Sequence, residues 1–185
     1  GAKAFYSGDI ARAIAKAVSQ APMRPGRMTI ADIETYIAKK RPPVCLPYRL
    51  WLICGMGPPS SGGLTTLQIM GLLRKFDLNN IDIETEDGVV KALHLLSEAS
   101  SLAFADRNFY IGDPDFIPVP SSELLDRDYL NLRSDGIDPK KALGRRQPGA
   151  PGLGAKHIPP IPEGAIGGMG LSTTHISIID SEGNA

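Results

Sequence analysis

Hydrophobic positions recur at helical spacing along much of the chain, which predicts a mainly helical fold. The first such stretch follows Ser7-Gly8-Asp9, whose residue types are common helix N-caps. In the next stretch, Thr29 stands three residues before Asp32, as in a capping box with Asp in place of Glu. We expect this second helix to end at Arg41-Pro42-Pro43, because the residue before a proline is pushed out of the helical conformation. The helix would carry Ile33, Tyr36 and Ile37.

Two longer helices are predicted in the middle of the chain. Residues 64–76 are apolar on most sides, so this helix should be buried. Residues 87–106 form the second, with Thr85 or Asp87 as its N-cap. His94 lies beside the apolar stripe of this helix, which favours a packed or surface histidine over a ligand. The residues expected on that stripe are Val89, Leu93, Leu96, Ser100 and Ala103. A further helix is predicted over residues 121–133.

The segment from Val44 to Met56 has β-favouring residues on both sides of a short central run, which predicts a pair of antiparallel strands. With the turn centred between Arg49 and Leu50, Cys45 and Cys54 lie opposite each other. A cross-strand disulfide is then geometrically possible, but a slip of one residue in the register would separate the two thiols. We therefore expect two free, half-buried thiols and keep the disulfide as the alternative.

Another strand is predicted at Thr173–Asp180, where β-branched residues dominate and Ile176 and Ile178 share one face. It follows residues 148–170, in which 12 of 23 residues are Gly or Pro. Such a tract cannot hold a packed helix or strand, so we expect a mobile linker there. By pattern alone, the chain is an α+β or layered α/β protein.

The charge of the chain narrows the classes of partner. Its 185 residues include 20 Lys and Arg and 20 Asp and Glu, which gives a formal net charge of zero. Because the two signs are interspersed, nothing favours nucleic acid or an anionic membrane as a partner.

Glycines and serines gather at Gly57–Gly63, where a phosphate-binding loop could be suspected. The Gly-Lys-Ser/Thr signature is missing, however, and Pro58 and Pro59 remove two backbone N–H donors that such a loop would need. The Gly-x-Ser-x-Gly spacing of a serine hydrolase is also missing. We therefore predict a rigid turn in which Ser60 or Ser61 caps the next helix.

Carboxylates gather at the end of the 87–106 helix and in the turn after it, but without a third ligand at metal spacing. Asp-Pro favours turn initiation. We expect Asp106, Arg107, Asp113 and Asp115 to tie this turn to the helix end.

A threonine at the start of a strand offers a possible nucleophile. An N-terminal threonine has a hydroxyl that can attack a carbonyl and an α-amine, of pKa about 7.7–8.0, that can take its proton. Thr173 lies inside the chain, so the bond between Ser172 and Thr173 would have to be cut first. The alternative is an ordinary edge strand with its hydroxyls facing solvent. His175 could assist proton transfer during the cut or act as a structural hydrogen-bonding group.

Three stretches, taken together and in order, resemble the γ-glutamyltranspeptidases. These are Gly57-Pro58-Pro59-Ser60-Ser61-Gly62-Gly63, then Ala105-Asp106-Arg107 with Gly112-Asp113-Pro114-Asp115-Phe116, then Thr173-Thr174-His175-Ile176-Ser177 with Asp180 and Gly183-Asn184-Ala185. In that family the first Thr of the last stretch becomes the N-terminus of the small subunit after self-cleavage and is the catalytic nucleophile. The resemblance thus implies that Ser172 and Thr173 flank the processing bond and that Thr173 is catalytic.

The resemblance also implies a fold, an activity and a division of the chain. We expect the layered αββα fold of N-terminal-nucleophile hydrolases and the transfer of a γ-glutamyl group, from a donor such as glutathione, to water or to an amino acid or peptide. No metal or organic cofactor is implied. The sequence is expected to be a fragment, inactive by itself. Residues 1–147 would belong to the large subunit, 148–172 to the linker and 173–185 to the first strand of the small subunit, the two subunits pairing as a heterodimer.

Three expectations stay open. A related γ-glutamyl hydrolase or a cephalosporin acylase would share the Thr-Thr-His junction. A non-catalytic scaffold that kept the fold would not be cut at Ser172–Thr173. Members of the family are commonly periplasmic, secreted or anchored outside the cell, which implies a location facing the outside.

Overall fold

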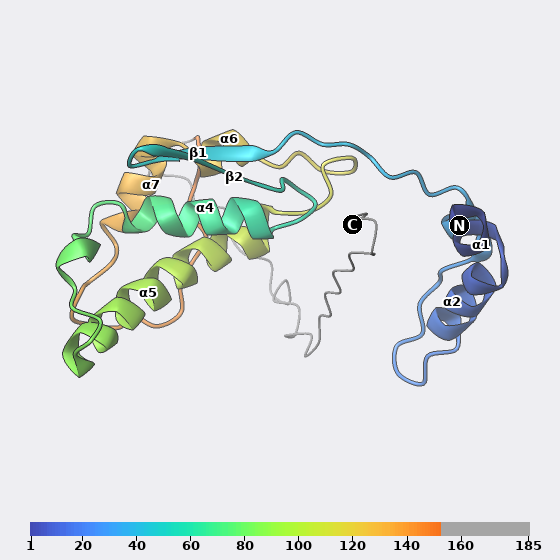
Figure 1. The fold of residues 1–185 in the computed structure, drawn as a ribbon, viewed down its shortest axis with the longest axis horizontal. Coiled ribbons are helices and arrows are strands. Elements are labelled where there is room, and N and C mark those ends of the chain that lie inside the picture. The colour runs from blue at the N-terminus through green and yellow to red at the C-terminus, as the bar shows by residue number, and fades with distance from the viewer. Residues whose placement is uncertain (153–185) are drawn as a thin grey trace. The chain divides into compact units, whose positions relative to one another are not determined.

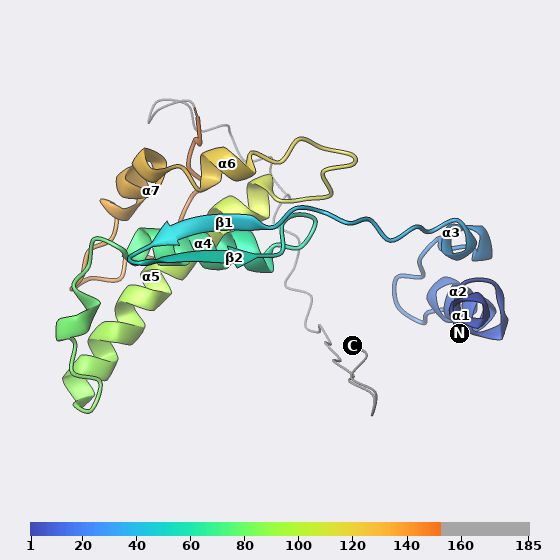
Figure 2. The ribbon, with the colours of Figure 1, turned by 45° about the horizontal axis from the view of Figure 1, so that its top comes forward.

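The computed structural model describes residues 1–152, and these fall into two compact units that divide between Arg41 and Pro42. Figures 1 and 2 label most of their helices and strands. The first unit holds three helices, α1 (Ala2–Ser7), α2 (Asp9–Ser19) and α3 (Ile30–Glu34). Its small core consists of Ala11, Ala15 and Ile33. None of the helices in the described residues is long and apolar enough to cross a membrane.

The capping box predicted at the start of α3 is confirmed. The Thr29 N–H donates to Asp32 Oδ2 at 2.7 Å, and the Asp32 N–H donates to Thr29 Oγ1 at 3.3 Å. The predicted end of this helix is wrong, because α3 stops at Glu34 and leaves Tyr36 and Ile37 exposed. The last helical hydrogen bond is donated by the Thr35 N–H to the carbonyl of Ala31, which also accepts from the Thr35 hydroxyl at 2.7 Å.

The second unit is built around helix α4 (Gly62–Leu73), which contacts a β-hairpin, helix α5 (Glu86–Tyr110) and helix α7 (Arg127–Ser134). Figures 1 and 2 show the hairpin and α5 against different sides of α4. The short elements η1 (Leu78–Asn80) and α6 (Ser121–Leu124) complete the described part. Seven α4 residues are buried, which confirms the predicted burial of this helix. The helix predicted over 121–133 is two helices, because the Asp126 carboxylate accepts from the N–H groups of Asp128 and Tyr129 and so begins α7.

The predicted hairpin is confirmed, with strands β1 (Val44–Tyr48) and β2 (Trp51–Gly55) paired antiparallel. Its register places Cys45 directly opposite Cys54, as the turn at Arg49 and Leu50 predicts. Leu46 is buried in the core of the unit, and Ile53 packs against that core from the same face of the hairpin. Leu52 and Cys54 are exposed on the other face.

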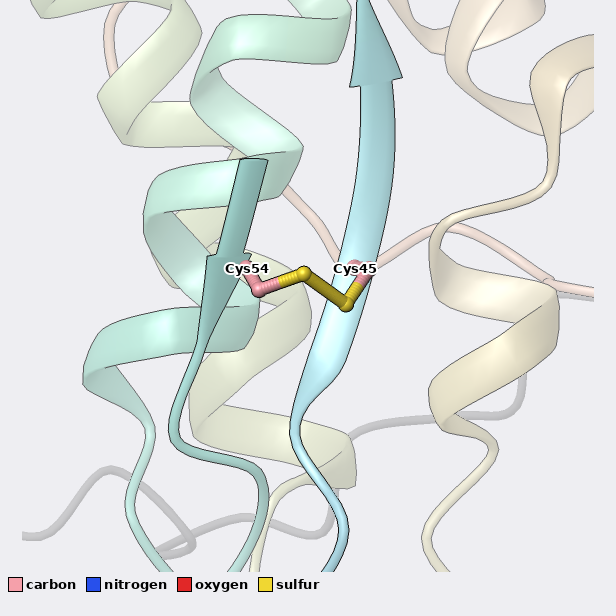
Figure 3. The surroundings of a disulfide bond; sticks show 2 residues. All are labelled: Cys45 and Cys54. Atoms are coloured by element: carbon pink, nitrogen blue, oxygen red, sulfur yellow. A yellow bond between two sulfur atoms is a disulfide. The ribbon is translucent and has the colours of Figure 1, made fainter. Parts of the chain in front are cut away.

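The expectation of two free thiols is wrong. Cys45 and Cys54 form a disulfide, with their Cα atoms 4.1 Å apart (Figure 3). The register does not slip, because a slip of one residue would move Leu46 and Ile53 off the core. The apolar face therefore fixes the pairing that brings the two sulfur atoms together.

Helix α5 begins as predicted, since the Thr85 hydroxyl accepts from the N–H of Gly88 at 3.1 Å. The predicted stripe is wrong at Val89, Leu93 and Leu96, which are exposed, and is confirmed at Ala103, which is buried. The face toward α4 instead buries Leu95, Ala99, Leu102 and Ala103. Apolar residues lie on two faces of α5, and the contact with α4 decides which of them is buried.

Candidate functional site

The two residues of the predicted processing bond, Ser172 and Thr173, lie outside the described residues, as does His175. The structure does describe the other two stretches of the family pattern. It shows that they meet in space. Among the described residues, no group of His, Cys, Asp and Glu side chains could hold a metal ion.

The turn Gly57–Gly63 meets the end of α5 through a side-chain hydrogen bond. Ser61 stands at the N-cap position of α4, as predicted, but its hydroxyl makes no capping bond. That hydroxyl instead accepts from Arg107 Nε at 3.2 Å. The first and second motif stretches, 46 residues apart at these two positions, are thus joined directly.

A close glycine contact also fixes this turn against β2. A Cβ on Gly63 would lie 2.3 Å from the carbonyl oxygen of Met56, and a Cβ on Gly55 would lie 2.7 Å from Gly63 Cα. Since real Cβ atoms do not approach so closely, only glycine fits at both positions. The second glycine of the Ser-Ser-Gly-Gly run therefore lets α4 start directly against the end of β2.

Asp106 is the centre of a buried polar cluster. Its side chain is almost fully buried, and its carboxylate accepts four hydrogen bonds. Oδ1 accepts from Arg133 Nη2 at 2.9 Å and from the Gly149 N–H at 2.7 Å. Oδ2 accepts from the Tyr129 hydroxyl at 2.7 Å and from Gln68 Nε2 at 3.2 Å. The donors come from α4, from α7 and from the segment after α7, so this carboxylate ties three parts of the chain to α5.

This finding corrects the role predicted for Asp106, which was to tie the following turn to the helix end. Asp106 faces the interior because it lies on the same side of α5 as Leu102 and Ala103. Asp113 holds the turn itself: its carboxylate accepts from the Asp115 N–H at 3.0 Å, and its carbonyl accepts from the Phe116 N–H at 3.0 Å. These bonds lie within the turn, so the tie between this turn and the helix end stays a prediction.

The cluster changes the acidity of two tyrosines. Burial and the negative charge of Asp106 raise the pKa of Tyr129 far above its usual value. Burial and the same charge raise the pKa of Tyr110 in the same direction. Both hydroxyls therefore keep their protons and act as hydrogen-bond donors.

Gly149 is held at both of its backbone polar groups. Its N–H donates to Asp106, and its carbonyl accepts from the Tyr110 hydroxyl at 2.6 Å. A Cβ on this residue would lie 2.3 Å from the Tyr129 hydroxyl oxygen and 2.8 Å from Arg133 Cδ, so a larger residue would displace these two side chains. Residues 148–151 are buried, which differs from the mobile linker expected to begin at Pro148.

A second buried ion pair holds the chain just before this point. Arg146 pairs with the Glu98 carboxylate on α5 and also donates to the Gly136 carbonyl at 3.0 Å. Both charged side chains are largely buried. Two ion pairs thus hold the C-terminal half of this unit against α5: Arg133 with Asp106 attaches α7, and Arg146 with Glu98 attaches the segment after α7.

Sequence reasoning missed most members of these clusters. The spacing of Tyr129 and Arg133 places them on one face of a helix, which is the only local signal available. Nothing near Gln68 or Gly149 in the sequence indicates that each binds a carboxylate on α5. His94, by contrast, has the structural role predicted for it, since Nε2 donates to the carbonyl of Asp138 at 2.8 Å.

Comparison with known proteins gives a consistent result. The sequence model of the family described as gamma-glutamyltranspeptidase matches residues 1–185. The chain is 36% identical to a glutathione hydrolase proenzyme of Pseudomonas sp. strain A14, over all of this chain and 29% of that protein. It is 31% identical to an acylase ACY 1 proenzyme of Pseudomonas sp. strain SE83, again over all of this chain and 29% of that protein. The crystal structure of Helicobacter pylori gamma-glutamyltranspeptidase is similar with a TM-score of 0.66 and 35% identity, over 85% of this chain and 43% of that one. The chain therefore spans less than a third of the length of these curated relatives.

Proposed function

Because the chain belongs to the γ-glutamyltranspeptidase family, we propose that the protein transfers γ-glutamyl groups and that Thr173 is its nucleophile. The observation that carries this proposal is the family match over residues 1–185, which includes Thr173-Thr174-His175-Ile176-Ser177. The donor would be glutathione or another γ-glutamyl compound, and the acceptor would be water, an amino acid or a peptide. Both relatives are named as proenzymes, which supports a protein that is made as a precursor.

The proposed reaction begins with a cut between Ser172 and Thr173. The cut releases the α-amine of Thr173, whose pKa of about 7.7–8.0 suits a general base at neutral pH. This amine takes the proton from Thr173 Oγ as the oxygen attacks the γ-glutamyl amide carbon. The C–N bond breaks, the leaving amine takes the proton, and a γ-glutamyl ester forms on Thr173. Water or an amine acceptor then attacks the ester and frees the threonine.

The test is the intact mass and N-terminal sequence of the full-length protein, beside a Thr173→Ala variant. We expect the wild type to yield a subunit that begins Thr-Thr-His-Ile-Ser and the variant to remain whole. A folded wild-type protein that remains whole would contradict the proposal and favour a non-catalytic scaffold. Turnover of a γ-glutamyl anilide by the cut protein then tests the donor class.

An acylase that acts on cephalosporin side chains is the second candidate, because an acylase proenzyme is among the relatives at 31% identity. Such an enzyme would share the cut at Thr173 and differ in the acyl group it accepts. Parallel assays of the cut protein with a γ-glutamyl anilide and a glutaryl amide separate the two candidates. Faster turnover of the glutaryl amide would favour the acylase.

The architecture and location of the whole protein belong to the same proposal. We infer a layered αββα arrangement in which a large and a small subunit pair after the cut. We also infer an oxidising location, periplasmic or outside the cell. The disulfide between Cys45 and Cys54 supports this location, because structural disulfides persist mainly in such compartments. Fractionation of cells that express the full-length protein tests it.

A further inference from the structure

The Cys45–Cys54 disulfide crosses between β1 and β2 near the end of the hairpin that lies opposite its turn (Figure 3). Leu46 and Ile53 alternate with the two cysteines along the strands and face the core, so the cysteines face away from it. Cys54 is exposed, whereas Cys45 is half-buried. A protein disulfide that is exposed is more readily reduced than one that is enclosed in a core.

The surroundings of the disulfide suit attack by a thiolate, the anion that carries out thiol–disulfide exchange. Strands β1 and β2 contain no acidic residue, and the turn between them carries the cation of Arg49. The side chains of the hairpin therefore do not repel an incoming anion. A thiolate approaches the attacked sulfur from the side opposite the leaving sulfur. For Cys54 this path passes over the outer edge of β2, which has no strand neighbour in the described residues.

The hairpin does not depend on the disulfide alone. Five residue pairs keep its strands in register, and Leu46 and Ile53 anchor them to the core. A break in the bond between the sulfur atoms removes neither of these contacts. The two thiols therefore stay opposite each other after reduction, and the disulfide can form again. This makes the exchange reversible in the folded protein.

We propose that Cys54 is a site of reversible thiol–disulfide exchange with small thiols such as glutathione. A thiolate attacks Cys54 Sγ, the bond between the two protein sulfur atoms breaks, and Cys45 leaves as a thiolate that takes a proton. The small thiol remains on Cys54 as a mixed disulfide. A second small thiol then attacks the sulfur of the first, which frees Cys54 as a thiol and releases a disulfide of the two small thiols. Two small thiols are thus oxidised as the protein disulfide is reduced.

This site goes beyond the proposed function and rests on it only for the choice of glutathione as the thiol. Reduction of the folded full-length protein by glutathione is the first test. Samples are taken over time, blocked with N-ethylmaleimide and digested with trypsin, which cuts after Arg49 and so places Cys45 and Cys54 on separate peptides. We expect both cysteines to become labelled, at a rate that changes less than about twofold when urea is added below the unfolding transition. Reduction that requires unfolding would speed up more than about tenfold over the same urea range. That result, or a disulfide that stays intact, overturns the site.

The second test compares the two sulfur atoms in a matched pair of variants. Cys45→Ser leaves Cys54 as a thiol, Cys54→Ser leaves Cys45, and each variant is mixed with oxidised glutathione. We expect the mixed disulfide at Cys54 to form at least about fivefold faster than that at Cys45, because Cys54 is exposed and Cys45 is half-buried. Equal rates, or a faster rate at Cys45, overturn the assignment to Cys54. Turnover of a γ-glutamyl anilide is measured on the same wild-type samples. Exchange without turnover counts against the proposed function and leaves the exchange site standing.

Discussion

The replacement Asp106→Asn tests the buried cluster most directly. Asparagine has the shape of aspartate but carries one carbonyl oxygen and one NH₂ group. Each carboxylate oxygen of Asp106 accepts from two donors, so the NH₂ group would face two donors and satisfy neither. The change would also leave the Arg133 guanidinium, whose side chain is 15% exposed, without its counter-ion.

The expected loss follows from these contacts. Removing one partner of a buried ion pair costs about 3–5 kcal/mol, because the other charge stays buried and unpaired. A lost hydrogen bond to a charged group costs about 1.5–3 kcal/mol, and part of this is already included in the first figure. We therefore expect Asp106→Asn to lower the free energy of unfolding by about 3–5 kcal/mol.

The assay is urea unfolding of the full-length protein, followed by tryptophan fluorescence and circular dichroism, with the midpoint and slope compared between variants. Asp135→Asn is the control, because Asp135 pairs with Lys75 at the surface at 2.8 Å and should contribute less than about 1 kcal/mol. A loss below about 1 kcal/mol for Asp106→Asn would refute the reasoning. The Arg133 charge would then have to be solvated well enough without Asp106.

Three further predictions concern single features of the second unit. Gly149→Ala should lower the melting temperature by several degrees, because its Cβ would meet the Tyr129 hydroxyl. Gly62→Ala is the control and should not lower it, because its Cβ would have its nearest neighbour at 3.7 Å. Equal melting temperatures for the two variants would contradict the close contact at Gly149. Because the folded protein raises the pKa of Tyr129 above its ordinary value of 10.0, the contribution of the protonated hydroxyl is complete below pH 10 and is lost as the pH rises beyond it. Urea midpoints between pH 9 and 11 should therefore fall more steeply for the wild type than for Tyr129→Phe, and parallel curves would argue against the buried hydroxyl. Thiol counting under denaturing, non-reducing conditions should find no free thiol, and two free thiols would contradict the disulfide. Replacing both Cys45 and Cys54 with alanine should lower the free energy of unfolding by about 2–3 kcal/mol in urea, as expected for a separation of 9 residues.

Local chemistry predicted the elements of this protein better than their packing. The capping box at Thr29 and the N-cap at Thr85 depend on residues three positions apart, and both are confirmed. The hairpin register follows from a turn between two β-favouring runs. For α5 the sequence shows apolar residues on two faces, and only the contact with α4 selects Leu95 and Ala99 over Leu93 and Leu96.

The polar clusters show the same limit more strongly. Asp106 lies 38 residues from Gln68 and 43 from Gly149, and no local pattern relates these positions. The sequence led us to expect free thiols for a similar reason. The register that brings Cys45 to Cys54 is fixed by the burial of Leu46 beneath the hairpin, which the sequence does not show. The proposed nucleophile differs from both, because Thr173 was found through a family resemblance that the comparisons support.

The Asp106 cluster also has a consequence for the order in which the protein is made. Ribosomes add residues from the N-terminus, so Gln68 and Asp106 exist before Tyr129 and Arg133, and Gly149 comes last of all. Gly149 follows Gln68 by 81 residues (149 minus 68), which takes about 4–16 s at 5–20 residues per second. Until then the carboxylate lacks one of its four donors, and the segment that covers it has not yet been made. The last of the four donors is therefore added 23 residues (172 minus 149) before synthesis reaches the junction at Ser172 and Thr173.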